Sequence, residues 1–452
     1  MLDQTCNALW TDFQIQTGAD PHLERVTFRR WMCRRSFTHL FPPPILDPIQ
    51  FESLERDTLQ ILKIIRSIPE RFYGGDIQRW LDFLLIRGDE AALLLRLQTP
   101  RFQMMATQFV RPDFILTVDG PKLVEMNVST PIGGMHTSGP YQEAFARSEY
   151  SKYLARLGIK LESPDLAAIW TKAFQDVARK CAGNRAPVLF AATANPTDRF
   201  TGRQTFMNMA SNAGFAVLSG PFRELEIDDS GVSIEGERID AIFTMFTWSE
   251  LRRHVPLNLV SQLAELDEKG LVDFIAPPGS ALFDNKANLE LLSSNIYDSN
   301  FTSDERGLLD KYIPRTFRLD VGSRSRALAS QDALVLKPTS ECAGRGVIVG
   351  RHCNRDTWLN AIEAASQSKQ LHVCQETIPP LLPITVTDGA QSNAYFMSLG
   401  PMVFGSRHAG TYVRQAPDRG IIPILNQSVG AEAGIAFVKA DTPSLSHQSH
   451  QS

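Results

Sequence analysis

The chain has 452 residues, which at about 150 residues per domain is long enough for about three domains. Glycine (29) and proline (27) occur at ordinary frequency, so collagen-like and low-complexity classes are excluded. Lysine and arginine number 46 and aspartate and glutamate 50, which gives a net charge of −4. A protein whose main partner is duplex nucleic acid usually carries a basic excess, so no nucleic-acid partner is expected.

The cysteines stand singly, without a CxxC pair, so neither a zinc site nor a disulfide framework is indicated. They are Cys6, Cys33, Cys181, Cys342, Cys353 and Cys374. Residues 1–16 lack the basic and apolar regions of a secretory signal. Because no apolar run has the length of a membrane span, no membrane partner is expected. We therefore expect a cytoplasmic, mixed α/β enzyme that acts on small molecules.

The first hundred residues are predicted to be helical, because apolar residues recur at a helical period over 51–71 and 76–97. Asp76 follows two glycines and is suited to cap the second helix. The elements expected next are a strand pair at 113–127, a helix at 141–157 and a helix that begins at Ser163-Pro164.

From residue 186 onward strands alternate with helices, which is typical of a parallel sheet. The expected strands are 188–192, 216–219, 239–246 and 272–276, and the expected helices are 202–213 and 255–269. Beyond residue 279 both strands and helices are expected, without a regular alternation. Strands are expected there at 333–337, 346–350, 371–375, 395–399, 412–414 and 421–425, with a helix at 355–367. The polar tail from Asp441 has no apolar periodicity and is expected to be disordered.

Three side chains with oxygen donors are predicted to meet on one face of the first strand pair. The Asp119-Gly-Pro segment forms a turn, and a loop made of this segment would place Asp113 opposite Asn127. Because side chains alternate along a strand, Asp113, Glu125 and Asn127 would then share one face. Two carboxylates and an amide suit a hard cation such as Mg²⁺ shared with phosphates. The alternative is an ordinary solvated hairpin face.

Two lysines are placed where they could bind phosphate. Lys337 ends a strand before a loop that contains Gly344 and Gly346. Glycine amides beside a lysine charge suit phosphate, unless this loop is only a plain hairpin turn. Lys286, in the sequence Asp-Asn-Lys-Ala at the expected start of a helix, would add a second cation unless it is merely solvated.

Two further segments suggest contacts to a planar base and to an anion. Gln375 and Glu376 precede Ile378 and a pair of prolines, which suits a hinge whose backbone meets a base; the alternative is an edge strand that stops at the prolines. Arg111 extends the face of the hairpin and could reach a phosphoryl oxygen. Arg414 could clamp a carboxylate or a phosphate. The alternative for Arg414 is a structural ion pair, and the alternative for Arg111 is a surface or ion-pair residue.

Taken in order, these segments resemble the circularly permuted ATP-grasp ligases, and most closely the synthetase domain of glutathionylspermidine synthase and related bacterial proteins. In that family an Arg-x-Asp-Phe segment is followed by Glu-x-Asn, twelve residues after its Asp, and then by Thr-Pro. The matching segments here are Arg111-Pro-Asp113-Phe114, Glu125-Met-Asn127 and Thr130-Pro131. The family's other motifs are matched by Asn285-Lys286-Ala287, Lys337-Pro338, Gly344-Arg345-Gly346 and Gln375-Glu376. The resemblance covers about residues 110–430.

The resemblance implies a role for each matched residue. The implied Mg²⁺ ligands are Asp113, Glu125 and Asn127. The implied ATP-binding residues are Lys286, Lys337, Ser340, Gly344, Arg345, Gly346, Gln375, Glu376 and Ile378. Arg111 would stabilise the phosphoryl group during transfer, and Arg414 would contact a phosphate or an acyl phosphate.

The resemblance also implies an ATP-grasp fold whose usual order is permuted. A helical region with the metal-binding strands would occupy 1–160, and a pre-ATP-grasp-like α/β lobe would occupy 161–280. The nucleotide-binding lobes would follow at 281–440 and the disordered tail at 441–452. Residues 1–100 match none of the family's substrate-binding elements, so the acid and the amine are left open.

The implied activity is that of an ATP- and Mg²⁺-dependent carbon–nitrogen ligase. ATP would phosphorylate a substrate carboxylate to an acyl phosphate, and an amine would displace phosphate to give an amide, with ADP released. Three alternatives stay open. They are a ligase for carrier-tethered or peptide substrates in secondary metabolism, a non-catalytic nucleotide-binding protein on this fold, and a kinase that phosphorylates without ligation.

Overall fold

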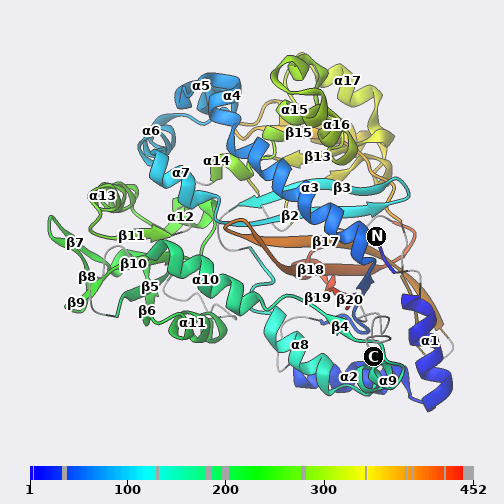
Figure 1. The fold of residues 1–452 in the computed structure, drawn as a ribbon. Helices are drawn as coiled ribbons and strands as arrows, with labels where there is room; N and C mark the ends of the chain where they lie inside the picture. Colours follow the sequence, from blue (N-terminus) through cyan, green and yellow to red (C-terminus); the bar gives the residue numbers. More distant parts are fainter. Residues whose placement is uncertain are drawn as a thin grey trace, which may run out of the picture.

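The computed structural model shows a mixed α/β protein in which several sheets are covered by helices (Figure 1). The residues that the structure describes are 1–3, 5–32, 38–128, 132–178, 186–195, 203–275, 281–341, 344–381, 384–388, 391–421 and 424–440. The expected disordered tail and the Thr130-Pro131 match lie outside these ranges. Within them, none of the helices combines the length and the apolar composition needed to cross a membrane.

The largest sheet joins strands from distant parts of the chain, in the order β19-β18-β17-β2-β3 with β16 paired to β17. Its strands are β2 (Phe109–Thr117), β3 (Gly120–Val128), β16 (Ile384–Asp388), β17 (Gln391–Phe404), β18 (Arg407–Pro417) and β19 (Glu432–Ile435). Neighbouring strands run antiparallel. β2 pairs with β17, so the predicted hairpin lies beside C-terminal strands (Figure 1). The apolar residues of β3, including Leu123 and Met126, join the main core together with Ile61 of the helix over 48–66.

A second antiparallel sheet has the order β12-β15-β13-β14. Its strands are β12 (Thr316–Arg318), β13 (Leu334–Pro338), β14 (Ile348–Val349) and β15 (His372–Glu376), and the helices beside it are α17 (Arg324–Ala329) and α18 (Arg355–Ser366). Leu336 and Cys374 pack with Trp358 in a separate core. Because side chains alternate along strands, Lys337 and Gln375 face the other side of this sheet.

The strands predicted from residue 186 onward pair in parallel, in the order β11-β10-β5-β6. They are β5 (Val188–Thr193), β6 (Ala216–Pro221), β10 (Ala241–Thr244) and β11 (Asp273–Ile275), with helices α10 (Leu166–Ala178), α11 (Arg203–Asn212), α12 (Trp248–His254) and α13 (Leu257–Glu268). An antiparallel meander that the sequence did not predict follows β6. It consists of β7 (Glu226–Asp228), β8 (Gly231–Ile234) and β9 (Glu237–Ile239).

The first hundred residues are helical, as predicted. The helices are α1 (Cys6–Thr17), α2 (Pro21–Trp31), α3 (Pro48–Arg66), α4 (Ile68–Tyr73), α5 (Ile77–Phe83), α6 (Gly88–Leu97) and α7 (Pro100–Ala106). The side chain of Asp76 accepts a hydrogen bond from the amide of Arg79, which confirms the predicted cap. A continuous helix over 76–97 is wrong, because Leu85 takes a left-handed φ of 55° between α5 and α6.

Three other predicted elements differ from the structure. The helix expected at 141–157 is divided into α8 (Ser138–Arg147) and α9 (Glu149–Arg156) at Ser148, whose hydroxyl caps the second helix. The next helix begins at Leu166 rather than at Pro164, because the Asp165 side chain accepts from the amide of Ala168. Of the strand expected at 421–425, residues 421, 424 and 425 lie outside any strand, and residues 422 and 423 lie outside the described ranges.

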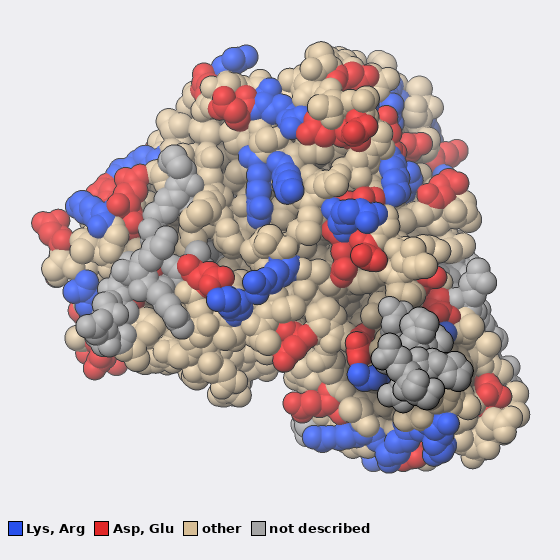
Figure 2. Space-filling view, in the orientation of Figure 1, with Lys and Arg blue, Asp and Glu red and all other residues tan. Residues whose placement is uncertain are grey.

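The remaining elements connect these layers. They are β1 (Ile45–Leu46), β4 (Leu161–Glu162), α14 (Ala281–Asp284), α15 (Asn288–Ser293), α16 (Ser303–Tyr312) and β20 (Phe437–Lys439). β1, β20 and β4 form a small sheet that ties the two ends of the chain together. Acidic and basic side chains are interspersed over much of the face in Figure 2, in keeping with the near-neutral composition.

Candidate active site

The predicted hairpin exists, but its register differs from the one expected. Thr117 pairs with Gly120, so the turn is shorter than predicted, and Asp113 lies opposite Glu125 rather than Asn127. Without any other change, the register set by this shorter turn would place Asp113 and Glu125 on opposite faces of the hairpin. A bulge between Asp113 and Phe114 adds a residue to β3 and restores the common face of Asp113, Glu125 and Asn127.

Asp113 lies buried between two arginines that the sequence analysis had singled out separately. Its carboxylate accepts from Arg111 Nε at 3.0 Å and from Arg414 at 2.7 Å, and Asn127 Nδ2 lies 3.0 Å from Oδ2. Burial alone would raise the pKa of Asp113, but Arg111 and Arg414 outweigh it and lower the pKa to about 2. The pairing of β2 and β18 with β17 therefore assembles a buried cluster of one carboxylate and two guanidinium groups.

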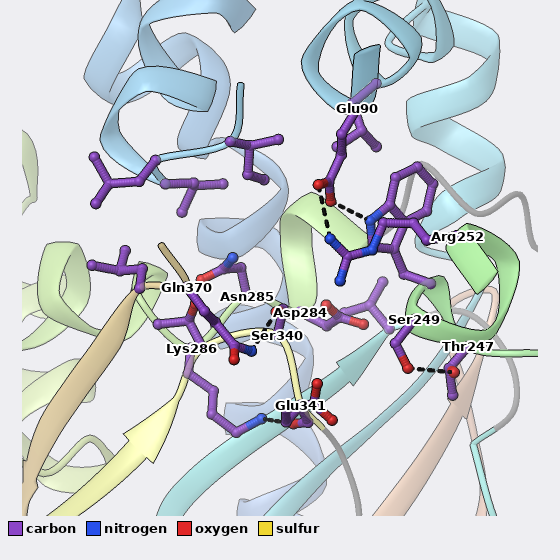
Figure 3. A pocket seen from close by; sticks show the side chains of 18 of the residues that line it. Glu90, Thr247, Ser249, Arg252, Asp284, Asn285, Lys286, Ser340, Glu341 and Gln370 are labelled. Carbon is purple, nitrogen blue, oxygen red and sulfur yellow. Dashed lines mark hydrogen bonds and ion pairs between the residues drawn. The ribbon is translucent and has the colours of Figure 1, made fainter. Parts of the chain in front are cut away.

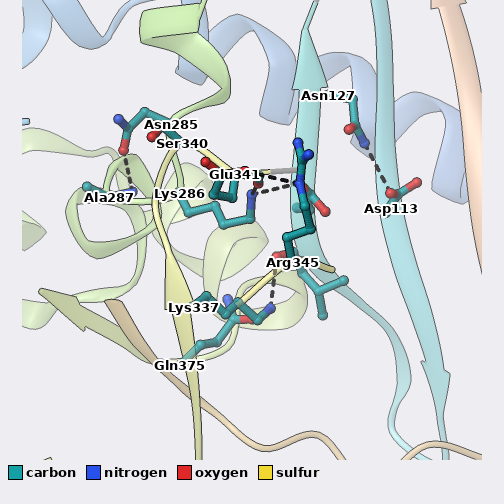
Figure 4. Close-up of polar contacts among 12 residues, drawn as sticks. Asp113, Asn127, Asn285, Lys286, Ala287, Lys337, Ser340, Glu341, Arg345 and Gln375 are labelled. Carbon is teal, nitrogen blue, oxygen red and sulfur yellow. Dashed lines mark hydrogen bonds and ion pairs between the residues drawn. The ribbon is translucent and has the colours of Figure 1, made fainter. Parts of the chain in front are cut away.

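Each of the two predicted lysines has a polar neighbour, Glu341 for Lys286 and Gln375 for Lys337 (Figure 4). Lys286 Nζ is 2.7 Å from Glu125 Oε1 and donates to the carbonyl of Glu341 at 2.7 Å. Lys337 Nζ donates to Gln375 Oε1 at 2.6 Å. Lys286 does not open a helix as predicted; it lies in the turn between α14 and α15. Burial lowers the pKa of Lys337 to about 8, against the opposing charge of Glu125.

Most of the predicted residues line one cavity of about 150 Å³ between the two antiparallel sheets. Those on its wall are Asp113, Glu125, Lys286, Lys337, Gly344, Arg345, Gln375, Glu376, Ile378 and Arg414. Asn127 and Ser340 instead line a neighbouring cavity. Arg111 and Gly346 line neither cavity. Arg111 lies in the sheet and donates to Asp113. Gly346 lies against Pro338 and has a positive φ of 70°.

The cavity offers the contacts that a nucleotide needs. Ile115, Val335 and Val349 supply apolar walls, and the lysines supply positive charge. Two hydroxyls on the wall, Thr377 Oγ1 and Ser398 Oγ, are buried and find no hydrogen-bond partner among the described residues. Buried hydroxyls are rarely left unpaired, so these two favour a polar ligand between the sheets.

Two of the three residues predicted to hold Mg²⁺, Glu125 and Asn127, fit that cation, whereas the carboxylate of Asp113 is engaged by Arg111 and Arg414. Asn127 uses its amide nitrogen on Arg111 O and Asp113, which leaves its carbonyl oxygen as the donor for a metal. Together with Glu125 this gives oxygen ligands only, as Mg²⁺ prefers. Within the described ranges, no cluster of three or more His, Cys, Asp and Glu side chains suited to a metal occurs.

A larger cavity of about 770 Å³ adjoins the first and shares Glu125, Lys286 and Glu341 with it (Figure 3). Its wall combines the α5–α6 connection, the end of β3, the start of α12 and the loop over 339–341. Asp284 also faces it, and burial raises the pKa of this carboxyl well above its usual range. A cleft therefore leads from the predicted metal ligands toward the N-terminal helices.

Several residues at the site carried no signal in the sequence. Nothing in the local sequence distinguishes Ser398, which reaches the site because β17 pairs with β2 and β18. Gly400 is required because a Cβ there would lie 2.8 Å from Arg111 Cδ. Glu90 and Arg252 come from helices far apart in the chain and meet only in the fold. None of these positions belongs to a local motif, so only the tertiary structure reveals them.

No protein-family model matches this chain, and no curated protein matches it. It is similar to a provisionally assigned gamma-glutamylcysteine synthetase of Methylobacillus flagellatus KT, with 13% identity and a TM-score of 0.46, over 83% of this chain and 87% of the other. D-alanyl-alanine synthetase A of Vibrio cholerae has 9% identity and a TM-score of 0.30, over 56% and 88%. D-cycloserine synthetase DcsG has 13% identity and a TM-score of 0.27, over 46% and 67%. These similarities are too low to assign the chain to a family, so its function is inferred from its own residues.

Proposed function

We propose that the protein is an ATP- and Mg²⁺-dependent carboxylate–amine ligase. The observation that supports this most strongly is the cavity between the two antiparallel sheets. It brings together two lysines, the carboxylate of Glu125 and two buried hydroxyls that find no partner among the described residues, from segments that are distant in the sequence. The order of the sequence motifs supports the same proposal, with a circularly permuted ATP-grasp arrangement of the lobes at 1–160, 161–280 and 281–440.

In this proposal each cluster has a defined task. Glu125 and the carbonyl oxygen of Asn127 would hold Mg²⁺, which would neutralise charge on the phosphates. Asp113, which is paired with Arg111 and Arg414, would keep Asn127 in position. Lys286 and Lys337 would bind those phosphates, beneath the loop over 339–346. The backbone of Glu376 and Ile378 would meet the base. Such a site works mainly by positioning and by electrostatic stabilisation.

In the proposed reaction the acid and the amine occupy the larger cavity, beside the cavity for the nucleotide. A substrate carboxylate placed near Glu125 and Asn127 would attack the terminal phosphorus, so that a new C–O–P bond forms as the bond to ADP breaks. An amine would then attack the acyl carbon and phosphate would leave with the electrons of the C–O bond. Arg414, which lines the cavity, would stabilise the phosphoryl charge, whereas Arg111 would hold Asp113 in place. Acyl phosphates hydrolyse readily, so the cleft must exclude water during the reaction.

The nucleotide product tests this proposal. We expect ADP and phosphate in equal amounts, released only when both an acid and an amine are supplied from a library of amino acids, polyamines and short peptides. Hydroxylamine should intercept the activated acid as a hydroxamate. Chromatography of the spent nucleotide decides the result. AMP as the stoichiometric product would refute the mechanism, and a phosphorylated product without an amide would favour a kinase.

The low pKa of Lys337 predicts that nucleotide affinity depends on pH. With a pKa of about 8, this lysine is mostly protonated near pH 7 and mostly neutral near pH 9. The charged groups that influence its pKa are Glu125, Lys286 and Asp113. We therefore expect the affinity for a non-hydrolysable ATP analogue to fall by up to about tenfold over that interval.

Calorimetric titration of Lys337→Met should show weaker binding and a loss of this pH dependence. Lys369→Met is the matched control, because Lys369 lines only the larger cavity and is exposed. If Lys337→Met keeps the affinity and the pH profile of the parent protein, Lys337 does not contact the nucleotide.

A further inference from the structure

A hollow rich in arginine adjoins the larger cavity and also borders the cavity between the antiparallel sheets at Glu341 and Arg345. Its volume is about 360 Å³, and its wall consists of Ser249, Arg252, Arg253, Glu341 and Arg345. Ser249, Arg252 and Glu341 also line the 770 Å³ cavity, so the two spaces are continuous. A ligand that begins beside the predicted metal ligands can therefore extend toward these arginines.

Arg252 is held in place before any ligand binds. Trp248 Nε1 donates to Glu90 Oε1 at 2.6 Å, and Arg252 Nη1 donates to Glu90 Oε2 at 2.9 Å (Figure 3). The side chain of Arg252 is 41% exposed, whereas that of Glu90 is 25% exposed. A guanidinium group has five N–H donors, and Glu90 occupies only part of them. Arg252 is therefore positioned by Glu90 and still has N–H donors for a ligand.

The neighbouring arginine is also fixed from one side. Arg253 donates to the carbonyl of Ser249 at 3.0 Å and to its hydroxyl at 3.1 Å. Among the described residues on the wall of the hollow, Glu341 is the one carboxylate, and it lies 3.2 Å from Arg345. With Glu90 paired to Arg252, three guanidinium groups meet two carboxylates, and the remaining positive charge of this concave surface attracts an anion.

The position of the hollow favours a substrate anion over the phosphates of a nucleotide. Arg252 and Arg253 are absent from the wall of the 150 Å³ cavity, whereas Glu341 and Arg345 line both spaces. The larger cavity between the two ends has apolar walls from Leu84, Ile86 and Phe246. An uncharged middle section of a ligand fits beside these side chains, with charged groups at its two ends.

We propose that the acid substrate carries a second negative group, most simply a second carboxylate, which Arg252 and Arg253 bind while the first is activated near Glu125. This inference rests on the proposed ligase function and narrows its substrate class to dicarboxylic or otherwise dianionic acids. Arg345, at the boundary of the two spaces, contributes charge to either ligand. Glu90 acts as a positioning residue for Arg252.

Matched acids test this proposal by direct binding. The protein, saturated with Mg²⁺ and a non-hydrolysable ATP analogue, is titrated calorimetrically with dicarboxylates from succinate to pimelate and with their monoamides. We expect at least one dicarboxylate to bind about tenfold more tightly than its monoamide, since two charge-assisted contacts are lost in the latter. The Arg252→Gln/Arg253→Gln double variant should lose this preference and keep the affinity for the ATP analogue. Arg147→Gln, at an exposed position on α8, is the control for charge.

Three results would overturn the proposal. They are no binding by any acid of the series, equal binding of dicarboxylates and monoamides, and a preference that survives the double variant. Loss of affinity for the ATP analogue in the double variant would instead assign the arginines to the nucleotide phosphates. Failure of the ligase proposal is distinguishable, because the acid preference would then be present while no ADP is released with any amine.

Discussion

Replacing Glu125 by glutamine is expected to lower ATP-dependent turnover by at least about a hundredfold while the protein stays folded. The carboxylate lies at the junction of both cavities, 2.7 Å from Lys286, and its side chain is 26% exposed. Glutamine keeps the shape and can still accept from Lys286, so the fold should tolerate it. It lacks the negative charge that Mg²⁺ requires beside the phosphates.

The measurement combines ADP release with Mg²⁺-dependent binding of a non-hydrolysable ATP analogue, and circular dichroism follows the melting temperature. Asp119→Asn serves as the matched control, because Asp119 lies exposed at the turn of the same hairpin. Its turnover and binding should equal those of the parent protein. A fully active Glu125→Gln variant would mean that Glu125 is not a metal ligand.

Replacing Asp113 by alanine is expected to lower the free energy of unfolding by about 3–5 kcal/mol, because two buried arginines would lose their shared partner. Arg111 is 6% and Arg414 8% exposed, so water cannot compensate either charge. The sheet would keep its backbone pairing but would hold two adjacent guanidinium groups of like charge. Urea unfolding followed by circular dichroism measures the effect, with Asp119→Ala as the control.

The pKa of Asp113 also predicts how the stability of the fold depends on pH. The pKa of Asp113 is about 2 in the folded protein, against an ordinary value of 3.8. Ionised Asp113 therefore contributes about 2 kcal/mol to the free energy of unfolding above about pH 4, and this contribution is lost as the pH falls toward 2. The Asp113→Ala variant should lack this part of the acid dependence. A variant as stable as the parent protein at neutral pH would contradict the description of a buried, mutually dependent cluster.

Elements with strong local signals were predictable from the sequence. The alternation of strands and helices after residue 186 predicted the parallel sheet, and Asp76 predicted a helix cap. The register of the first hairpin was not predictable, because the Asp119-Gly-Pro segment does not reveal that the turn is short or that a bulge compensates for it. The break at Leu85 was missed for a similar reason, since leucine gives no local signal for a left-handed φ.

In the candidate site, too, some residues had a local sequence signal and others had none. Lys286, Lys337 and Glu125 belong to recognisable segments, and the structure brings them together. Ser398 and the Glu90–Arg252 pair have no such segment, because their environment depends on contacts between distant parts of the chain. Sequence patterns report local geometry, whereas an unpaired buried hydroxyl or a positioned arginine is a property of the assembled fold.

The pairing of β2 with β17 also constrains how the chain acquires its structure during synthesis. Phe109 pairs with Phe404, so the first hairpin emerges from the ribosome long before its neighbour on the other side exists. Until then one edge of β2, with its unpaired backbone groups and the apolar side chains around it, stays open to other chains. Contacts of such long sequence separation also slow folding. The nascent protein is therefore expected to need protection from aggregation until almost its whole length has been translated.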